Sequence, residues 1–410
     1  MSVIINSNFF FRRSFILAYT ETTSKSWFTR IRESFGGIVT GLVLIGIGTW
    51  LLWWNEERTF KTAGAIGEAE LVTQEVNDIS KIDPALEGKL IHAAGHADTK
   101  DILRDDLFGV SINALRLERN IEYYQWKEDS KKETKKKLGG GEETVTTYTY
   151  SQKWTRKPVD SSQFKDPDYR GRNTTIATIE DLDSWAPDVT FGAYTLPDFL
   201  KRSIGGSQPM TIQSVDIKAL SGVVRVGNLE SINDLITVSG STVYIGRNPS
   251  SPRIGDVRVT FKSTPPADVS IIAQVIRNTF EQYRASNGYS FSRLSMGIVG
   301  MQNMFEGARS DNNFMAWVLR VVGIICVFLG LRMIFSPLSV IADVIPILGT
   351  IIDAGAGFVC FVLALAWSLI VIAVAWLRFR PLLAGGLIAL ALALVFMAYA
   401  KGRKNNAQVV

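Results

Sequence analysis

The chain alternates between long apolar stretches and one long polar region. An uncharged stretch, FGGIVTGLVLIGIGTWLLWW, occupies residues 35–54, and the charged sequence NEER at 55–58 follows it at once. An apolar helix of about 20 residues is roughly 30 Å long, which matches the hydrocarbon core of a bilayer. Trp50, Trp53 and Trp54 lie where aromatic side chains favour the membrane interface. The pattern therefore predicts a first membrane-spanning helix at residues 35–54.

Further apolar stretches lie near the C-terminus and predict spanning helices at residues 316–335, 354–377 and 382–400. Residues 336–353 are also mostly apolar, but they contain two aspartates, two prolines and a glycine. A carboxylate in hydrocarbon costs roughly 3 kcal/mol or more, and proline disfavours an unbroken helix. We therefore predict a re-entrant or interfacial connection at 336–353. The chain then has four spans, one N-terminal and three C-terminal.

The polar region at residues 55–313 contains no spanning stretch and predicts one soluble domain. Its residues suit β-structure, because several segments are rich in β-branched and aromatic residues or alternate between apolar and polar positions. These segments are 144–154, 256–262, 269–276 and a hairpin at 235–246, and a short helix is predicted at 196–203. The predicted fold class is a multi-pass α-helical membrane protein with a β-rich α+β extracytoplasmic domain.

Residues 130–143, SKKETKKKLGGGEE, form a charged segment interrupted by glycines between two strand-like segments. Such a segment is typical of a solvated hairpin tip. Contact with lipid or with an acidic partner is the functional alternative, and the sequence leaves it open.

Basic residues indicate the orientation of the chain. The positive-inside rule places the N-terminal segment 1–34 in the cytoplasm, because five basic residues precede the first span. The soluble domain then faces a periplasm or an organelle lumen, and the basic tail at 401–410 returns to the cytoplasm. The five residues are Arg12, Arg13, Lys25, Arg30 and Arg32.

Residues 26–35 place their apolar side chains near one helical face and resemble an interfacial amphipathic helix. Lys25, Arg30 and Arg32 are then candidates for contact with lipid headgroups. A basic flank that only orients the first span is the simpler alternative.

Charged residues within the apolar C-terminal region are candidate ion pairs of the helical bundle. Arg320 and Arg332 lie near the two ends of the predicted second span, from which both can extend to opposite interfaces. Alternatively, Arg332 pairs with Asp343 or Asp353 inside the bundle. A polar path through these four residues is the feature that a channel or transporter would use.

Gly37 and Gly41 of the first span are separated by three residues, a spacing that permits close approach of two helices. The motif can serve self-association, but packing against another helix of the same chain is the simpler use.

Composition excludes several functions. The net charge is +5, concentrated near the predicted membrane edges, so it indicates membrane orientation and not nucleic-acid binding. Both cysteines lie in apolar segments, so the soluble domain has no disulfide. His92 and His96 have a spacing found in helical zinc sites, but Gly95 and the strand-like residues before His92 argue against a helix. We expect no metal, no cofactor and no enzymatic activity.

Several short sequences resemble the transmembrane protein 43 family, which is also called LUMA. Their order along the chain, together with the arrangement of one N-terminal and three C-terminal spans, extends the resemblance over nearly the whole chain. The sequences are WNEER at 54–58, GKLIH at 88–92, LRLERNIEYYQWKE at 115–128, GDVRV at 255–259 and WLRFRPL at 376–382.

The resemblance implies a four-span membrane scaffold that self-associates, contacts membrane lipids and organises other membrane proteins. The identity of those other proteins stays open. For an animal member, the resemblance implies a location in the endoplasmic reticulum and inner nuclear membrane, with emerin and lamins as partners. No residue here indicates those two partners. A bacterial member would lie in the inner membrane with a periplasmic domain. We favour a bacterial source, although nothing in the sequence excludes a eukaryotic host. A channel or transporter is the alternative function.

Overall fold

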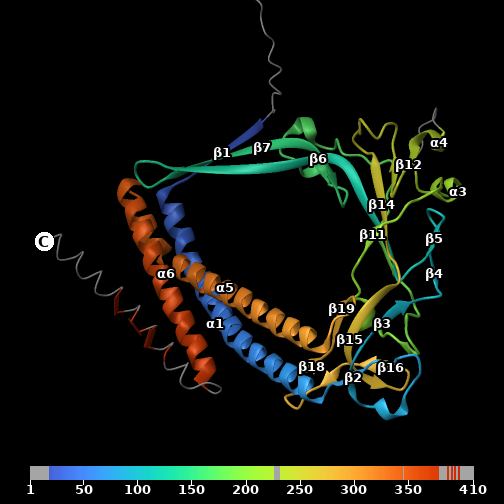
Figure 1. Ribbon diagram of the computed structural model, residues 1–410. Helices are drawn as coiled ribbons and strands as arrows, with labels where there is room; N and C mark the ends of the chain where they lie inside the picture. Colours follow the sequence, from blue (N-terminus) through green and yellow to red (C-terminus); the bar gives the residue numbers. More distant parts are fainter. Residues whose placement is uncertain are drawn as a thin grey trace, which may run out of the picture.

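A computed structural model describes residues 18–225, 231–344 and 346–377, together with residues 386, 389–390, 392–393 and 396–397. Three parts can be followed in Figure 1: a bundle of long helices, a β-rich domain beside one end of the bundle, and a long β-hairpin that extends from the domain to the other end. The hairpin, the domain and the bundle form the three sides of a triangle.

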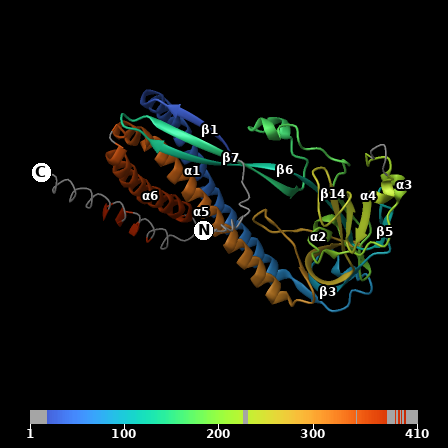
Figure 2. The same cartoon turned by 90° about the horizontal axis from the view of Figure 1, so that it is seen from above.

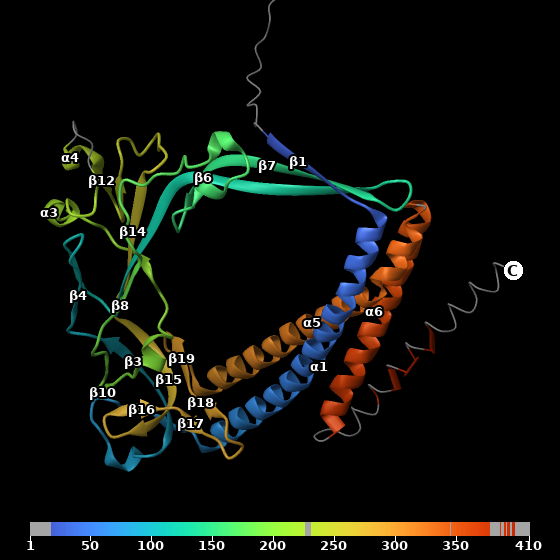
Figure 3. The ribbon, with the colours of Figure 1, turned by 180° about the vertical axis from the view of Figure 1, so that it is seen from behind.

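The bundle consists of α1 (Trp27–Val72), α5 (Met301–Ala342) and α6 (Pro346–Leu377). All three are long and apolar enough to cross a membrane, and they contain the predicted spans at 35–54, 316–335 and 354–377. Helices α1 and α5 run side by side in opposite directions, as Figures 1 and 3 show from two sides. The chain is therefore an integral membrane protein with three candidate spans among its described residues. The fourth predicted span, 382–400, lies mostly outside those residues.

Residues 336–353, predicted as a re-entrant or interfacial connection, are divided between two helices. Helix α5 continues through Pro337 to Ala342, and α6 begins at Pro346. Proline is tolerated inside a membrane helix when neighbouring groups satisfy the freed backbone atoms. It is favourable in the first turn of a helix, where its missing N–H leaves no hydrogen bond unmade. The connection is a tight corner whose described residues are Asp343 and Val344.

Helices α1 and α5 both extend beyond the predicted spans and support the β-rich domain. Ile66 and Ala69 of α1 pack with Met304 and Phe305 of α5 in a small apolar cluster. Phe305 also stacks on Phe291 of the domain, with ring centroids 5.4 Å apart. Because each helix runs without a break from the apolar segment to the domain, the bundle and the domain have a fixed relative position.

The domain is built from two main sheets. The eight-stranded sheet has the order β1-β7-β6-β14-β13-β12, with β11 on β14 and β8 on β6. The seven-stranded sheet has the order β10-β9-β3-β15-β16, with β19 on β15 and β2 on β3, and two small sheets pair β4 with β5 and β17 with β18. The strands are β1 (Ala18–Lys25), β2 (Gln74–Val76), β3 (Leu90–Asp98), β4 (Ile102–Asp105), β5 (Val110–Asn113), β6 (Arg116–Lys136), β7 (Glu142–Thr155), β8 (Leu182–Trp185), β9 (Thr190–Phe191), β10 (Tyr194–Thr195), β11 (Gln208–Pro209), β12 (Ile236–Ser239), β13 (Thr242–Ile245), β14 (Val257–Thr264), β15 (Ala267–Ile276), β16 (Thr279–Glu281), β17 (Tyr283–Arg284), β18 (Ser290–Phe291) and β19 (Arg293–Met296). Short helices are α2 (Asp198–Lys201), α3 (Ile217–Leu220) and α4 (Ile232–Leu235).

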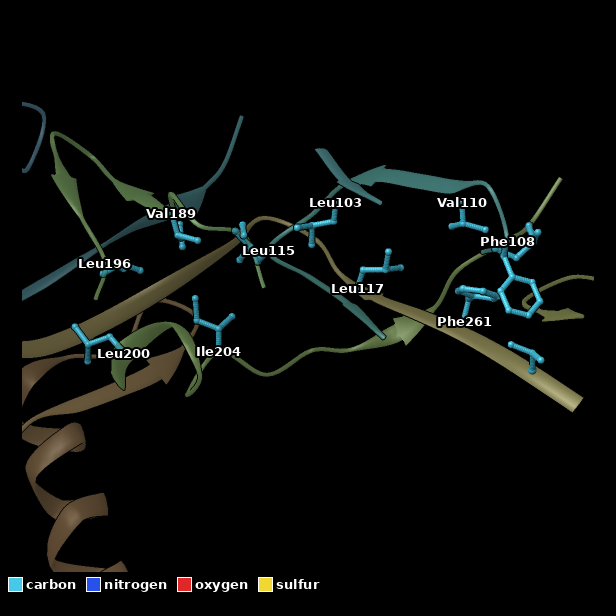
Figure 4. Close-up of a cluster of buried hydrophobic side chains, with 14 of the residues drawn as sticks. Leu103, Phe108, Val110, Leu115, Leu117, Val189, Leu196, Leu200, Ile204 and Phe261 are labelled. Atoms are coloured by element: carbon cyan, nitrogen blue, oxygen red, sulfur yellow. The ribbon is translucent and has the colours of Figure 1, made fainter. Parts of the chain in front are cut away.

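The core of the domain follows the alternation read from the sequence. Val257, Val259 and Phe261 of β14 are fully buried, because successive side chains of a strand point to opposite faces. The Phe108 ring meets the Phe261 ring edge-on at 5.3 Å, within the apolar cluster of Figure 4. The predicted strands at 144–154, 256–262 and 269–276 and the hairpin at 235–246 are confirmed. The predicted helix at 196–203 is shorter and spans Asp198–Lys201.

The long hairpin of β6 and β7, with β1 along its outer edge, is called the arm below (Figure 2). Its tip comprises residues 137–141, in the segment predicted as a hairpin tip. Gly139 and Gly140 adopt φ values of +87° and +81°, a region that other residues rarely occupy. The glycines of this segment thus make the sharp reversal at the tip possible.

The N-terminal segment differs from its prediction. Residues 18–25 form β1, which pairs antiparallel with residues 142–149 of β7. The predicted interfacial helix at 26–35 forms the first turns of α1, capped by Ser26. The boundary predicted between the segment 1–34 and the domain 55–313 is therefore crossed by a sheet.

Candidate functional sites at the two ends of the bundle

Helices α1 and α5 pack through a row of glycines. A Cβ atom added to Gly41 would lie 2.6 Å from the Gly330 carbonyl oxygen, and one added to Gly48 would lie 2.9 Å from that of Gly323. Real Cβ atoms do not approach this closely, so the crossing depends on glycine. Gly37 is less constrained, since its Cβ would lie 3.8 Å from the nearest atom, the Met333 carbonyl oxygen. The predicted glycine motif thus serves packing within the chain.

A buried ion pair joins all three helices at the domain end of the bundle. The Arg320 Nε and Nη2 atoms of α5 donate to the Glu56 carboxylate of α1 over 2.6 and 2.8 Å. Trp376 Nε1 of α6 donates to the same carboxylate. The Glu56 side chain is 2% exposed and that of Arg320 is 13% exposed. We call these three residues the domain-end joint.

Aromatic rings surround the arginine of this joint. The Arg320 guanidinium lies 4.9 Å from the Trp317 ring centroid and 5.6 Å from that of Trp376, an arrangement that favours a cation. A cavity of about 200 Å³ lies beside the pair and is also lined by Thr59, Phe60, Asn313 and Ala316. Below it, Asn55 Nδ2 donates to the Ala316 carbonyl oxygen at 3.0 Å. The joint thus ties the three helices together at the point where the apolar segment of α1 ends.

A second ion pair lies between α5 and α6. Arg332 Nη2 is 3.1 Å from Asp353 Oδ1, and Arg332 Nη1 donates to the Asp353 carbonyl oxygen at 2.9 Å. The two side chains remain 33% and 42% exposed. Of the pairings left open by the sequence, the structure brings Arg332 to Asp353 and not to Asp343, while Arg320 pairs with Glu56.

The opposite end of the bundle holds a buried carboxylate with two cations. Asp343, at the α5–α6 corner, is 1% exposed, and its carboxylate accepts from Arg30 Nη2 of α1 and from Lys136 Nζ of the arm, both at 2.6 Å. Arg30 Nε also lies 3.0 Å from Glu142 Oε2. We call Arg30, Lys136 and Asp343 the arm latch. The two carboxylates, Asp343 and Glu142, balance the two cations, so the cluster is electrically neutral.

Backbone contacts strengthen the latch. The Gly139 N–H donates to the Val344 carbonyl oxygen at 3.2 Å, and Arg30 Nη1 donates to the Gly140 carbonyl oxygen at 2.6 Å. Trp27 Nε1 donates to the Val340 carbonyl oxygen at 3.0 Å, and its ring covers Gly140, where a Cβ atom would clash at 2.2 Å. The arm tip is therefore docked on the ends of α1 and α5.

The residues predicted to contact lipid headgroups have different surroundings. Arg30 is largely buried within the latch, 10% exposed. Lys25 pairs with Glu33 at 2.7 Å and remains exposed. Arg32 is exposed. Arg30 is therefore held within the protein, whereas contact of Lys25 and Arg32 with lipid headgroups stays a prediction.

The histidines lie on strand β3, as the sequence around them indicated. His92 Nε2 is 2.9 Å from the Val299 carbonyl oxygen, and His96 Nδ1 is 2.7 Å from Asp268 Oδ1. Within the part of the chain that the structure describes, no group of three or more His, Cys, Asp or Glu side chains could hold a metal ion.

Several residues of these sites were not identified from the sequence. Glu56 lies in the charged sequence that follows the first apolar stretch, and nothing in that sequence indicated a buried ion pair. Lys136 was one of five lysines in the predicted tip. Gly323 and Gly330 lie seven residues apart in α5, which is the same spacing as that of Gly41 and Gly48. This match in spacing is the sequence signal that could have indicated the packing of the two helices.

Comparison with known proteins identifies relatives over most of the chain. A family model described as Transmembrane protein 43 matches residues 123–381. Transmembrane protein 43 of Rattus norvegicus is 27% identical over 92% of this chain and 93% of its own length, and that of Homo sapiens is 28% identical over 92% and 93%. The Transmembrane protein 43 homolog of Drosophila melanogaster is 25% identical over 84% and 89%. No solved structure matches significantly.

Proposed function

The chain belongs to the transmembrane protein 43 family, and we propose that it acts as a non-enzymatic integral membrane scaffold that self-associates and organises membrane or partner proteins. The observation that carries this proposal is the attachment of the β-rich domain to the bundle at both ends. The domain-end joint and the apolar cluster around Phe305 hold one end, and the arm latch holds the other. A domain fixed in this way presents its surface at a constant position relative to the membrane, as a scaffold requires.

Self-association must use a surface other than the glycine row, because the α1–α5 crossing already occupies it. Helix α1 keeps a broad apolar face exposed within the described part of the protein, where it can meet lipid or a second copy. Its residues include Phe35, Val39, Leu42, Val43 and Ile47. A second copy that covers part of this face would lose little, since lipid and protein side chains are similarly apolar.

The proposal is tested by co-expressing two copies of the full chain with different affinity tags. The complex is extracted directly into lipid nanodiscs, purified on the first tag and probed for the second. Its mass distribution is then measured over a dilution series. A scaffold that self-associates carries both tags and gives a mass above one chain per disc. Discs with one chain at every concentration, and no second tag, would overturn the proposal.

One observation favours a channel or transporter as the second candidate. Arg332 and Asp353 lie between spanning helices, yet both remain partly exposed, and charged residues at such positions often mark ion pathways. Ion flux into liposomes that falls in Asp353→Asn would support this reading. Flux equal to that of empty liposomes would exclude it.

The membrane that houses the scaffold follows from the host. We propose the inner membrane for a bacterial member, and the endoplasmic reticulum or inner nuclear membrane for a eukaryotic one. Density-gradient fractionation against marker proteins of each membrane tests the placement.

A further inference from the structure

We propose that the cavity beside the domain-end joint binds a membrane phospholipid, and that Arg320 Nη1 donates to the phosphate of this lipid. The cavity has a volume of about 200 Å³ and is lined by residues of α1, α5 and the end of α6. We call it the joint cavity. The inference does not depend on self-association, because residues of a single chain line the cavity.

The joint cavity lies at the level of the lipid headgroups. It begins where the apolar stretch of α1 ends, directly after the exposed rings of Trp53 and Trp54, and tryptophan favours the membrane interface. Along α1 the lining extends from Glu56 to Ala63, which is a rise of about 10 Å. The headgroup layer on each side of a bilayer is about 5–8 Å thick. The cavity therefore lies where the phosphates of the surrounding lipids are found.

One edge of the Arg320 guanidinium remains available to a ligand. Nε and Nη2 donate to the Glu56 carboxylate, so Nη1 of this planar group points away from that carboxylate. Among the residues that the structure describes, none accepts a hydrogen bond from Nη1. The Arg320 side chain borders the cavity and keeps 13% of its surface exposed. The two N–H groups of Nη1 can therefore donate to an acceptor that enters the cavity.

The other polar groups of the lining suit a phosphate. The hydroxyl of Thr59 and the amide of the exposed Asn313 side chain are neutral hydrogen-bond donors on the cavity wall. Glu56 is the one carboxylate among the described lining residues, and Arg320 and Trp376 already donate to it. Guanidinium groups bind phosphate oxygens in preference to most other acceptors. Because Glu56 balances the charge of Arg320, the site recognises the phosphate through hydrogen bonds and accepts lipids of different net charge.

The apolar part of the lining distinguishes a lipid from a soluble phosphate ester. Phe60 and Trp317 line the cavity and are 42% and 63% exposed. A lipid with its phosphate at Arg320 would cover these rings with its glycerol and acyl groups, and this burial of apolar surface adds to the binding. A soluble phosphate ester would leave the rings uncovered. The cavity therefore fits a phospholipid better than it fits the headgroup alone.

The test uses the full chain in dodecyl maltoside, a detergent without phosphate. Native mass spectrometry counts the bound lipids while the protein is titrated with phosphatidylcholine or with diacylglycerol of the same acyl chains. The two lipids share their apolar part, and only phosphatidylcholine carries a phosphate. We expect the wild type to bind one phosphatidylcholine saturably and to bind diacylglycerol at least about tenfold more weakly, because the hydrogen bonds to a charged group are lost.

Variants locate the site and identify the donor. Ala63→Phe places a ring in the cavity and should abolish the saturable binding of phosphatidylcholine. Leu71→Phe is the matched control and should bind like the wild type, because Leu71 is 88% exposed on the same helix, about 12 Å further along. The double variant Glu56→Gln with Arg320→Met removes the donor without leaving an unpaired charge. It should bind phosphatidylcholine and diacylglycerol with similar affinity.

Three results would overturn the proposal. Equal binding of the two lipids by the wild type, or no saturable binding of either, would exclude recognition of the phosphate, and this comparison needs no variant. Unchanged binding of phosphatidylcholine in Ala63→Phe would exclude the joint cavity as the site. Displacement of the lipid by an equal concentration of soluble glycerophosphocholine would show that the ligand is a soluble phosphate ester.

Discussion

Replacing Glu56 by glutamine should destabilise the three-helix bundle strongly, although the two side chains have nearly the same shape. The Glu56 carboxylate is 2% exposed and accepts from Arg320 at 2.6 and 2.8 Å and from Trp376. Glutamine removes the negative charge and one acceptor. The Arg320 guanidinium then remains in an apolar surrounding without its counter-charge.

The magnitude follows from the burial of both partners. Removing one partner of a buried ion pair costs about 3–5 kcal/mol, because the other charge is left uncompensated. The Arg320 side chain is 13% exposed, and it can recover some hydration by moving toward the neighbouring cavity. We therefore expect the lower end, about 3 kcal/mol of lost unfolding free energy.

Equilibrium unfolding in detergent micelles, followed by tryptophan fluorescence, measures this loss. The rings of Trp317 and Trp376, two of the ten tryptophans of the chain, lie against Arg320 and contribute to this signal. A double-mutant cycle with Arg320→Met separates the pair energy from the single effects. Because Arg320→Met also removes the stranded cation, the double variant should be more stable than Glu56→Gln by about 2 kcal/mol.

Two results would refute this reasoning. A loss below about 0.5 kcal/mol for Glu56→Gln would show that the pair contributes as little as a surface salt bridge. Strictly additive effects in the cycle would show that the two residues do not act together.

Three further predictions concern the rest of the molecule. Gly41→Leu should destabilise the bundle by about 3 kcal/mol or prevent its assembly, since even a Cβ atom there would lie 2.6 Å from a carbonyl oxygen. Equilibrium unfolding in detergent measures the lost stability. Gly46→Leu is the control, because a Cβ atom at Gly46 meets nothing within 4 Å. Asp343→Asn should release the arm and make residues 137–141 sensitive to trypsin. Equally slow cleavage of the wild type and the variant would contradict this prediction. Burial raises the pKa of the Tyr150 and Tyr244 hydroxyls, and their carboxylate partners Glu128 and Asp256 raise it further. Their contribution to stability is therefore present below pH 10 and declines as the pH rises above it. In Tyr150→Phe and Tyr244→Phe the alkaline loss measured by circular dichroism should be smaller.

The sequence predicted the elements whose signal is local. A run of apolar residues such as 35–54 specifies a spanning helix by itself, and alternation along 256–262 specifies a half-buried strand. Turn residues such as Ser239-Gly240-Ser241 specify a hairpin. The strand and the hairpin appear in the structure near their predicted limits, whereas the helix extends beyond them, from Trp27 to Val72.

The two bundle-end sites could not be predicted, because their residues are far apart along the chain. Asp343 is bound by Arg30 and Lys136, which lie 313 and 207 residues away. The sequence showed that a carboxylate in this region needs a partner, but the choice of partner depends on where the arm docks. In the same way, β1 (AYTETTSK) is mostly polar and has no continuous apolar face, and its pairing depends on the edge that β7 offers.

Labelling of sealed vesicles tests most directly whether the arm and the N-terminal flank of α1 form one unit. Single cysteines at Ser24 and Leu138, in the chain without Cys326 and Cys360, are exposed to a membrane-impermeant maleimide. If β1 pairs with β7 and the tip is docked on the bundle, both cysteines react from the same side of the vesicle. Reaction from opposite sides would contradict the arrangement.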